Sequence, residues 1–311
     1  MSIERKEYSY PSATGVADIY ARAWIPQDTE IKAVFQMVHG MAEHGERYED
    51  FAEYMCGQGY VFVINDHVGH GKSLKNSSER GFFGGDKNKF GDGFVDDAHA
   101  LTLMMKKEFG KPVILMGHSM GSFVARRYIT KYAGDIEGAI ICGTSGSNPG
   151  ASAGIILAKL ISAVKGEKHP SKLIDKIAFG SYNKRFEGRT AFDWLSRNTD
   201  NVDVYIKDDG CGYLFTASGY QNMFELLKSV SSDEWYNAVP KKLPIFLVSG
   251  TDDPVGNYSK GVREVCDRLK NSGHSDVKIK LYENDRHEIL NEKDNDKVYG
   301  DVADWCNALL K

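Results

Sequence analysis

The sequence "VILMGHSMGS", residues 113–122, contains a short apolar run that leads directly into a Gly-x-Ser-x-Gly motif. The apolar run predicts a buried strand, and the pattern from Ser122 to Tyr128 predicts a helix. Ser119 would then lie on a sharp turn between a strand and a helix. Such a turn can expose a serine hydroxyl as a nucleophile. The same motif also occurs by chance in ordinary loops, so the rest of the chain must decide between the two interpretations.

Strands and helices alternate on both sides of this motif. Apolar runs bounded by glycine or polar clusters predict strands at 32–39, 60–66, 112–117, 138–143, 243–250 and 277–282. Helical patterns of apolar residues lie between and after these runs, at 47–59, 92–110, 119–132, 257–270 and 297–311. This alternation indicates an α/β fold, with a mostly parallel sheet and helices on both of its faces.

The alternation is interrupted between about residues 145 and 237, where helical fragments are separated by glycines and polar clusters. We therefore expect one core formed by residues 1–144 and 238–311, with residues 145–237 inserted as a helical cap. Long insertions in compact domains are commonly functional, for example as lids.

Three of the predicted strands are followed by residues that can cooperate in catalysis. One is followed by Ser119, a later one by Asp252 and Asp253, and the next by His287. The carboxyl ends of parallel strands share one edge of a sheet, where ligands bind in open α/β folds. Histidine can take the proton of a serine hydroxyl near neutral pH, and a carboxylate can orient the imidazole. The order serine, acid, histidine therefore predicts nucleophilic catalysis.

The chain offers two candidate acids and two candidate histidines after the serine. His274 lies between a predicted helix and the next strand, at the wrong edge of the sheet, whereas His287 follows that strand. Asp253 directly precedes Pro254, which marks the turn itself. We therefore prefer Asp253 over Asp252 and His287 over His274.

Several segments together resemble the monoacylglycerol lipase and lysophospholipase branch of the α/β-hydrolase fold, over about residues 16–310. They are "VHGMAEHGERYEDFAEYMCGQGYVFVINDHVGHGKS" (38–73), "GHSMGS" (117–122), "GTDDPVG" (250–256) and "RHEILNE" (286–292). The resemblance implies a serine hydrolase that cleaves carboxylic esters through an acyl-enzyme, with a monoacylglycerol or a lysophospholipid as substrate. A short-chain carboxylesterase and a proline iminopeptidase-like aminopeptidase remain alternatives. A non-catalytic ligand receptor on the same fold is the alternative from another class.

The resemblance also assigns roles to individual residues. It implies Ser119 as nucleophile, Asp253 as acid and His287 as base. The backbone N–H groups of Met41 and Met120 would form the oxyanion hole, and the fold rule that the residue after the nucleophile supplies one donor points to Met120 as well. Neither a cofactor nor a metal is expected.

Other histidines and one cysteine are expected to be structural. The loop histidines should tie loops together through hydrogen bonds; they are His39, His44, His67 and His70. We expect His118 to pack away from the nucleophile and Cys211 to lie in the core of the cap.

The segment 153–164 is apolar nearly all round, which predicts a helix that is buried or faces something apolar. Ile155, Ile156 and Leu160 would either line an acyl channel or hold the cap together. A transient contact of the cap with a membrane surface is a further expectation.

The composition of the chain restricts its possible partners, its cysteine chemistry and its cellular location. The 311 residues carry a net charge of −4 and show no run of like charge, so we expect no nucleic-acid partner. The five cysteines are scattered without a C-x-x-C pair, which argues against a disulfide framework or a zinc signature. The N-terminal residues lack the apolar region of a signal peptide, and no apolar stretch reaches about 20 residues. We expect a cytoplasmic protein, and the sequence leaves its oligomeric state open.

Overall fold

The computed structural model describes residues 2–84 and 91–311. Within this part of the chain, the strands form one eight-stranded sheet in the order β1-β2-β4-β3-β5-β6-β7-β8. β1 and β2, and β2 and β4, pair antiparallel, and the remaining neighbours pair parallel. The strands are β1 (Ile3–Pro11), β2 (Asp18–Pro26), β3 (Ala33–Val38), β4 (Tyr60–Asn65), β5 (Val113–His118), β6 (Gly138–Cys142), β7 (Ile245–Gly250) and β8 (Val277–Tyr282). The mostly parallel sheet that the sequence predicts is confirmed.

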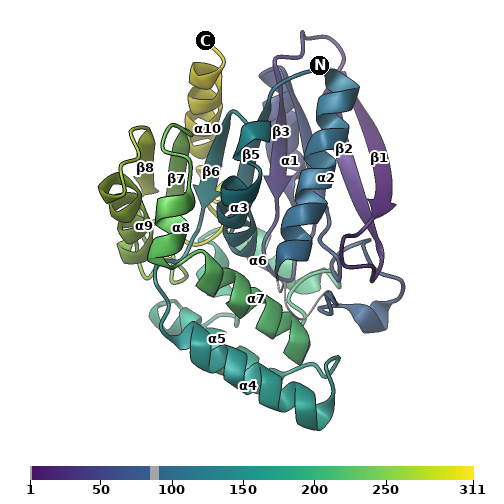
Figure 1. Cartoon of the computed structure of the whole chain (residues 1–311), viewed down its shortest axis with the longest axis vertical. Helices are drawn as coiled ribbons and strands as arrows, with labels where there is room; N and C mark the ends of the chain where they lie inside the picture. The colour runs from purple at the N-terminus through teal and green to yellow at the C-terminus, as the bar shows by residue number, and fades with distance from the viewer. Residues whose placement is uncertain (1, 85–90) are drawn as a thin grey trace.

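Helices cover both faces of the sheet (Figure 1). Because side chains alternate along a strand, Val34 packs into the core on one face and Phe35 into the core on the other. The first core is closed by α2 (Asp92–Phe109), α3 (Met120–Lys131) and α9 (Lys260–Asn271). The second is closed by α1 (Glu49–Gly57) and α10 (Asn295–Leu309).

The two N-terminal strands, β1 and β2, were not predicted from the sequence. β1 reads IERKEYSYP and is largely exposed at the edge of the sheet, so it lacks the apolar run of a buried strand. β2 does alternate, with Ile19, Ala21 and Ala23 fully buried, and that period of two was a usable signal.

The chain leaves the sheet after β6 and returns to it at β7. Between them lie α4 (Gly150–Lys165), α5 (Lys172–Phe179), α6 (Thr199–Lys207), α7 (Ala217–Ser229) and α8 (Asp233–Ala238). α4, α5 and α7 lie at one end of the sheet in Figure 1. α4 packs closely on α7, because Gly154 has no side chain and a Cβ there would lie 2.8 Å from the ring of Phe224.

Within residues 2–84 and 91–311, no helix is both long enough and apolar enough to span a bilayer.

Candidate active site

Ser119 occupies the sharp turn between β5 and α3. Its φ of 55° and ψ of −120° are rare for a residue with a side chain, so the turn is strained. A Cβ at Gly117 would lie 2.1 Å from the carbonyl oxygen of Gly121, and one at Gly121 would lie 2.1 Å from that of Val38. Both motif glycines are therefore required by close backbone approach, and the Ser119 side chain reaches the cavity described below.

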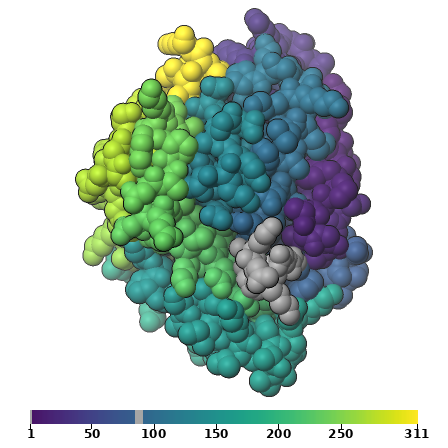
Figure 2. Space-filling view, in the orientation of Figure 1, coloured from purple at the N-terminus to yellow at the C-terminus, as the bar shows by residue number. Residues whose placement is uncertain are grey.

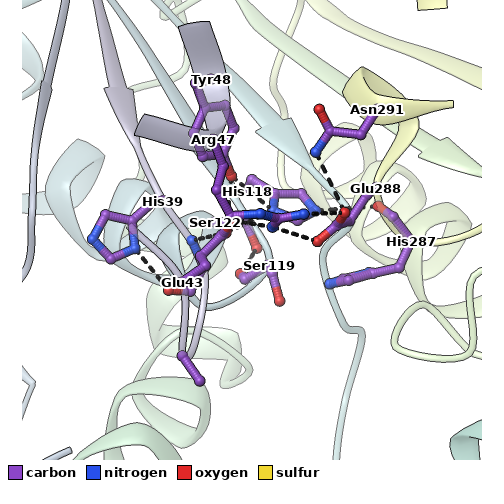
Figure 3. A network of polar contacts seen from close by, with 12 residues as sticks. His39, Glu43, Arg47, Tyr48, His118, Ser119, Ser122, His287, Glu288 and Asn291 are labelled. Carbon is purple, nitrogen blue, oxygen red and sulfur yellow. Dashed lines mark hydrogen bonds and ion pairs between the residues drawn. The ribbon is translucent and has the colours of Figure 1, made fainter. Parts of the chain in front are cut away.

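Asp253 and His287 form a buried pair that follows two neighbouring strands, β7 and β8. The two side chains are 0% and 2% exposed, and His287 Nδ1 lies 3.0 Å from Asp253 Oδ1. A carboxylate only accepts hydrogen bonds, so Nδ1 carries the proton and Nε2 is left as the basic nitrogen. In Figure 3 the His287 ring extends toward Ser119, and both side chains line the same cavity.

The surroundings of Asp253 keep it ionised. Burial opposes ionisation, but His287 and the Val255 N–H together lower the pKa of Asp253 below its ordinary value. The Val255 N–H donates to Oδ1 at 2.8 Å, and Ser249 Oγ donates to Oδ2 at 3.2 Å. A carboxylate held in this way can fix the imidazole tautomer and stabilise the imidazolium.

The structure separates the alternative acid and histidine from this pair. Asp252 precedes Asp253 in the turn, and its N–H donates to the Asp285 carbonyl at 2.9 Å. His274 lies after α9, where its ring contacts the Leu269 carbonyl at 3.0 Å. Among the described residues, those lining the cavity include His287 but neither Asp252 nor His274.

Two candidate oxyanion donors lie beside Ser119. Met41 and Met120 both line the cavity. Met120 is the first residue of α3, where helix N–H groups lack partners within the helix. The loop after β3 lies close to the serine, since a Cβ at Gly40 would be 3.1 Å from Ser119 Cβ. Ala42 has a positive φ of 51°, which sets the course of this loop.

A buried charge cluster, formed by Glu43, Arg47 and Glu288, lies beside His287 (Figure 3). Arg47 Nη1 donates to Glu43 Oε2 at 2.7 Å, and Arg47 binds both oxygens of Glu288 at 2.7 Å. Asn201 of α6 donates to Glu288 at 2.7 Å and so connects the cluster to the inserted helices. Burial disfavours the cation, but Glu288 and Glu43 raise the pKa of Arg47 well above its usual value. None of these three charged residues was predicted from the sequence to belong to the site.

The stability of the fold should depend strongly on this cluster. We expect Arg47→Met to lower the free energy of unfolding by about 3–5 kcal/mol, because two buried carboxylates lose their cation. Arg5→Met is a matched control, since Arg5 also contacts two carboxylates, Glu49 and Glu53, but is 58% exposed. Its loss should be at most about 1 kcal/mol. Urea denaturation measures both, and equal losses would contradict a special role for the buried cluster.

His118 does not simply pack in the core, and the expectation for it needs correction. Its Nε2 donates to the His287 carbonyl at 3.1 Å, and its Nδ1 faces Tyr48 Oη at 3.1 Å. Burial disfavours the charged ring, but the nearby Glu43 raises the pKa of His118 above its ordinary value. His118 therefore connects the charge cluster to the backbone of His287.

His39 and His67 tie two loops together, as expected, whereas His70 makes its contact within its own loop. The His67 N–H donates to His39 Nε2 at 3.0 Å, and His67 Nε2 lies 3.1 Å from the His39 carbonyl. Burial lowers the pKa of His39 to about 4, so its ring is neutral near pH 7. His70 contacts the Val68 carbonyl within its own loop, at 3.2 Å.

The cavity that contains Ser119 has a volume of about 820 Å³. One part of its wall is polar and includes Glu43, His118, His287 and Glu288. The remaining wall is mostly apolar and comes largely from the inserted helices, although Asn148, Asp175 and Asn183 also line it. Its apolar residues include Phe123, Leu157, Ile174, Ile177, Phe179, Met223, Phe224 and Leu227. The cavity is thus divided chemically, with Ser119 and His287 in its wall.

The proposed acyl-channel residues of α4 need correction. Ile155 is 5% exposed and belongs to the hydrophobic core, whereas Ile156 and Leu160 are 61% and 60% exposed. None of these three lines the cavity; among the described residues, α4 reaches it instead through Gly154, Leu157 and their neighbours. The apolar pattern identified the helix but gave the wrong face.

The chain is similar to several known proteins. A family model described as serine aminopeptidase, S33, matches residues 29–294. A monoacylglycerol lipase from Mycolicibacterium smegmatis is 27% identical over 317 residues, covering 100% of both chains. The monoglyceride lipase of Homo sapiens is 29% identical over 299 residues, covering 93% of this chain and 86% of the human one.

A solved structure is similar along the whole chain. The highly thermostable carboxyl esterase from Bacillus coagulans, in complex with glycerol, matches with a TM-score of 0.91 and 31% identity, and the match covers 100% of both chains. The eight-stranded sheet, its two layers of helices and these matches together identify the fold as that of the α/β-hydrolases. Because the family model spans most of its length, the chain belongs to the serine aminopeptidase S33 family of α/β-hydrolases.

Proposed function

We propose that this protein hydrolyses the ester bond of monoacylglycerols, with Ser119, Asp253 and His287 as its catalytic triad and residues 145–237 as its cap. The observation that carries the proposal is the divided cavity, which has an apolar wall for an acyl chain and a polar wall for a small alcohol. Each methylene group buried against the apolar wall would contribute about 0.8 kcal/mol to binding. The relatives named as monoacylglycerol and monoglyceride lipases support the same substrate class.

The proposed reaction follows from the arrangement of the three side chains. Ser119 Oγ attacks the ester carbonyl while His287 Nε2 takes its proton, and Asp253 stabilises the resulting imidazolium. The N–H groups of Met41 and Met120 bind the oxyanion, and such donors are worth roughly 3–4 kcal/mol each. His287 then protonates the leaving glycerol. A water molecule, deprotonated by His287, hydrolyses the acyl-enzyme and regenerates Ser119.

The polar wall favours a neutral alcohol over a phosphate head group. Glu43 and Glu288 line the cavity, whereas Arg47, in the described structure, is not part of its wall. Among the described residues, the wall contains no lysine or arginine, so it offers no cation to pair with a phosphate. The glycerol in the Bacillus coagulans esterase complex is consistent with an alcohol of this size.

The family description raises amide cleavage by an aminopeptidase as a second possibility. An aminopeptidase binds the free α-ammonium group of its substrate, and that group would need a carboxylate whose charge is not already paired. Arg47 binds both Glu43 and Glu288, so neither carboxylate has its full charge available. This cluster therefore offers no site for an ammonium group, and the substrate test includes aminopeptidase activity as an outcome.

A comparison of substrates tests the proposal. We expect kcat/KM to be highest for a monoacylglycerol of twelve or more acyl carbons, lower for p-nitrophenyl acetate, and lower again for lysophosphatidylcholine. A prolyl arylamide should not be hydrolysed. Preference for lysophosphatidylcholine or for the arylamide would refute the monoacylglycerol assignment. Absence of turnover with every substrate would favour a ligand receptor.

We further propose that the cap contacts a membrane surface transiently and that the protein works in a reducing, cytoplasmic setting. α4 and α5 form one end of the molecule in Figures 1 and 2. They expose apolar side chains at Ile156, Leu160, Val164, Leu173 and Ile177. Lysines accompany them at positions 159, 165, 168, 172 and 176, and such a mixture suits the surface of an anionic bilayer. All five cysteines are free and buried, as in proteins of reducing compartments.

Membrane contact should depend on the exposed residues of α4. We expect Ile156→Asp combined with Leu160→Asp to reduce binding to anionic lipid vesicles by about tenfold or more, because buried apolar area drives such binding. Turnover of p-nitrophenyl acetate and the melting temperature should change little, since both side chains are about 60% exposed. Val204→Asp on α6, which replaces a side chain that is 63% exposed, is the control and should bind vesicles normally. Unchanged vesicle binding of the double variant would contradict the proposal.

A further inference from the structure

A second group of polar side chains lies where the loop after β3 meets the loop after α6. His44, Asp208 and Cys211 each offer one atom that can bind a metal, and these atoms all lie within 4.8 Å of one another. His44 Nε2 is 2.8 Å from Asp208 Oδ2. None of these three residues belongs to the proposed triad.

We propose that His44, Asp208 and Cys211 form a binding site for a thiophilic divalent transition metal ion, best matched by zinc. Imidazole nitrogen, carboxylate oxygen and thiolate sulfur are the ligands that zinc takes in proteins, and three protein ligands leave a fourth position for water. Zinc bonds of about 2.0–2.3 Å place tetrahedral ligand atoms about 3.3–3.7 Å apart. The three side chains would therefore rotate to these separations when the ion binds. Binding forms a zinc–sulfur bond and releases the thiol proton to water.

The backbone around the ligands supports this role. The Gly210 N–H donates to Asp208 Oδ1 at 2.7 Å, which leaves Oδ2 facing His44. The Cys211 N–H donates to the Asp208 carbonyl at 2.9 Å and so holds the thiol near the carboxylate. Position 210 must lack a side chain, because a Cβ there would lie 2.8 Å from His44 Cδ2. Hydrogen bonds of this kind orient the ligands of metal sites.

The site is partly open to solvent, and a bound ion would connect the cap to the loop after β3. The side chains of His44 and Asp208 are 11% and 33% exposed. Close by, the Gly212 N–H donates to the Ala42 carbonyl at 3.0 Å, and Tyr205 Oη donates to the same atom at 3.2 Å. A metal ion would add a coordinate cross-link between the cap and the loop that contains the candidate oxyanion residue Met41. His44 and Asp208 are 164 positions apart, so the spacing of residues in the sequence could not reveal the site.

Titration of metal-free protein with cobalt(II) chloride tests the proposal directly. We expect a thiolate-to-cobalt charge-transfer band in the near ultraviolet that saturates at about one equivalent, because the cysteine sulfur is a ligand. Cys211→Ser should abolish the band. Cys266→Ser in α9 removes one thiol elsewhere and should retain it. Absence of the band from the parent protein, or its persistence in Cys211→Ser, overturns the proposal.

A thermal measurement with zinc chloride tests the histidine independently of the thiol. At about a hundredfold excess over the dissociation constant, zinc should raise the melting temperature of the parent protein by several degrees, because it should bind the folded state more tightly than the unfolded chain. The shift should disappear in His44→Gln and persist in His99→Gln, which alters a histidine on α2. An equal shift in the parent protein and in His44→Gln overturns the site as proposed.

Discussion

Replacing Ser119 with alanine will lower kcat for ester hydrolysis by about 10⁴–10⁶-fold, because the residues of a catalytic triad act as a unit. The fold should survive, since alanine keeps the Cβ that the strained φ of 55° already accommodates. The melting temperature should therefore stay within a few degrees of the parent value. Turnover of p-nitrophenyl acetate measures the loss of catalysis, and labelling by a fluorophosphonate measures the loss of the nucleophile. Both signals should disappear together.

Ser122→Ala is the matched control for this change. Ser122 is buried three residues further along the chain, in the same turn of α3, and its hydroxyl donates to the Ser119 carbonyl. A variant at this position removes a serine hydroxyl without removing the proposed nucleophile, so its kcat should stay within about tenfold of the parent. If Ser119→Ala retained more than a few per cent of the parent activity, or if Ser122→Ala were the inactive variant, the proposed nucleophile would be wrong.

The central part of the fold could be predicted because its sequence signals are local. The buried parallel strands are continuous apolar runs, and the turn at Ser119 requires glycines at 117 and 121 because the backbone passes within 2.1 Å of where a Cβ would be. Chain order then led to Asp253 and His287, since the carboxyl ends of parallel strands share one edge of the sheet. The edge strand β1 gave no comparable signal, because its exposed side is covered with charged residues.

The charged part of the site could not be predicted by the same reasoning. Glu43, Arg47 and Glu288 read as ordinary surface residues, and their burial becomes possible only because they pair with one another. Arg47 and Glu288 are 241 positions apart, so no local pattern connects them. The face of α4 that lines the cavity could not be predicted either, because a helix that is apolar nearly all round does not indicate which side is buried.

The second large effect concerns the acid and the base. Asp253→Asn should lower kcat by about 10⁴-fold, because an asparagine amide stabilises the wrong imidazole tautomer, and His287→Ala should cost at least about 10³-fold. The 3.0 Å contact between Asp253 and His287, both almost fully buried, is the physical reason.

Asp252→Asn is the sharpest control for these changes, because it makes the same chemical substitution one residue away. Asp252 contributes its backbone N–H to the carbonyl of Asp285, and that hydrogen bond survives the change of side chain. His274→Ala removes an imidazole whose ring contacts the Leu269 carbonyl at 3.0 Å, away from the cavity. Both controls should keep kcat within about tenfold of the parent, measured with p-nitrophenyl acetate on folded protein. A larger loss in Asp252→Asn than in Asp253→Asn would move the acid to the neighbouring residue, and a larger loss in His274→Ala than in His287→Ala would reject the proposed base.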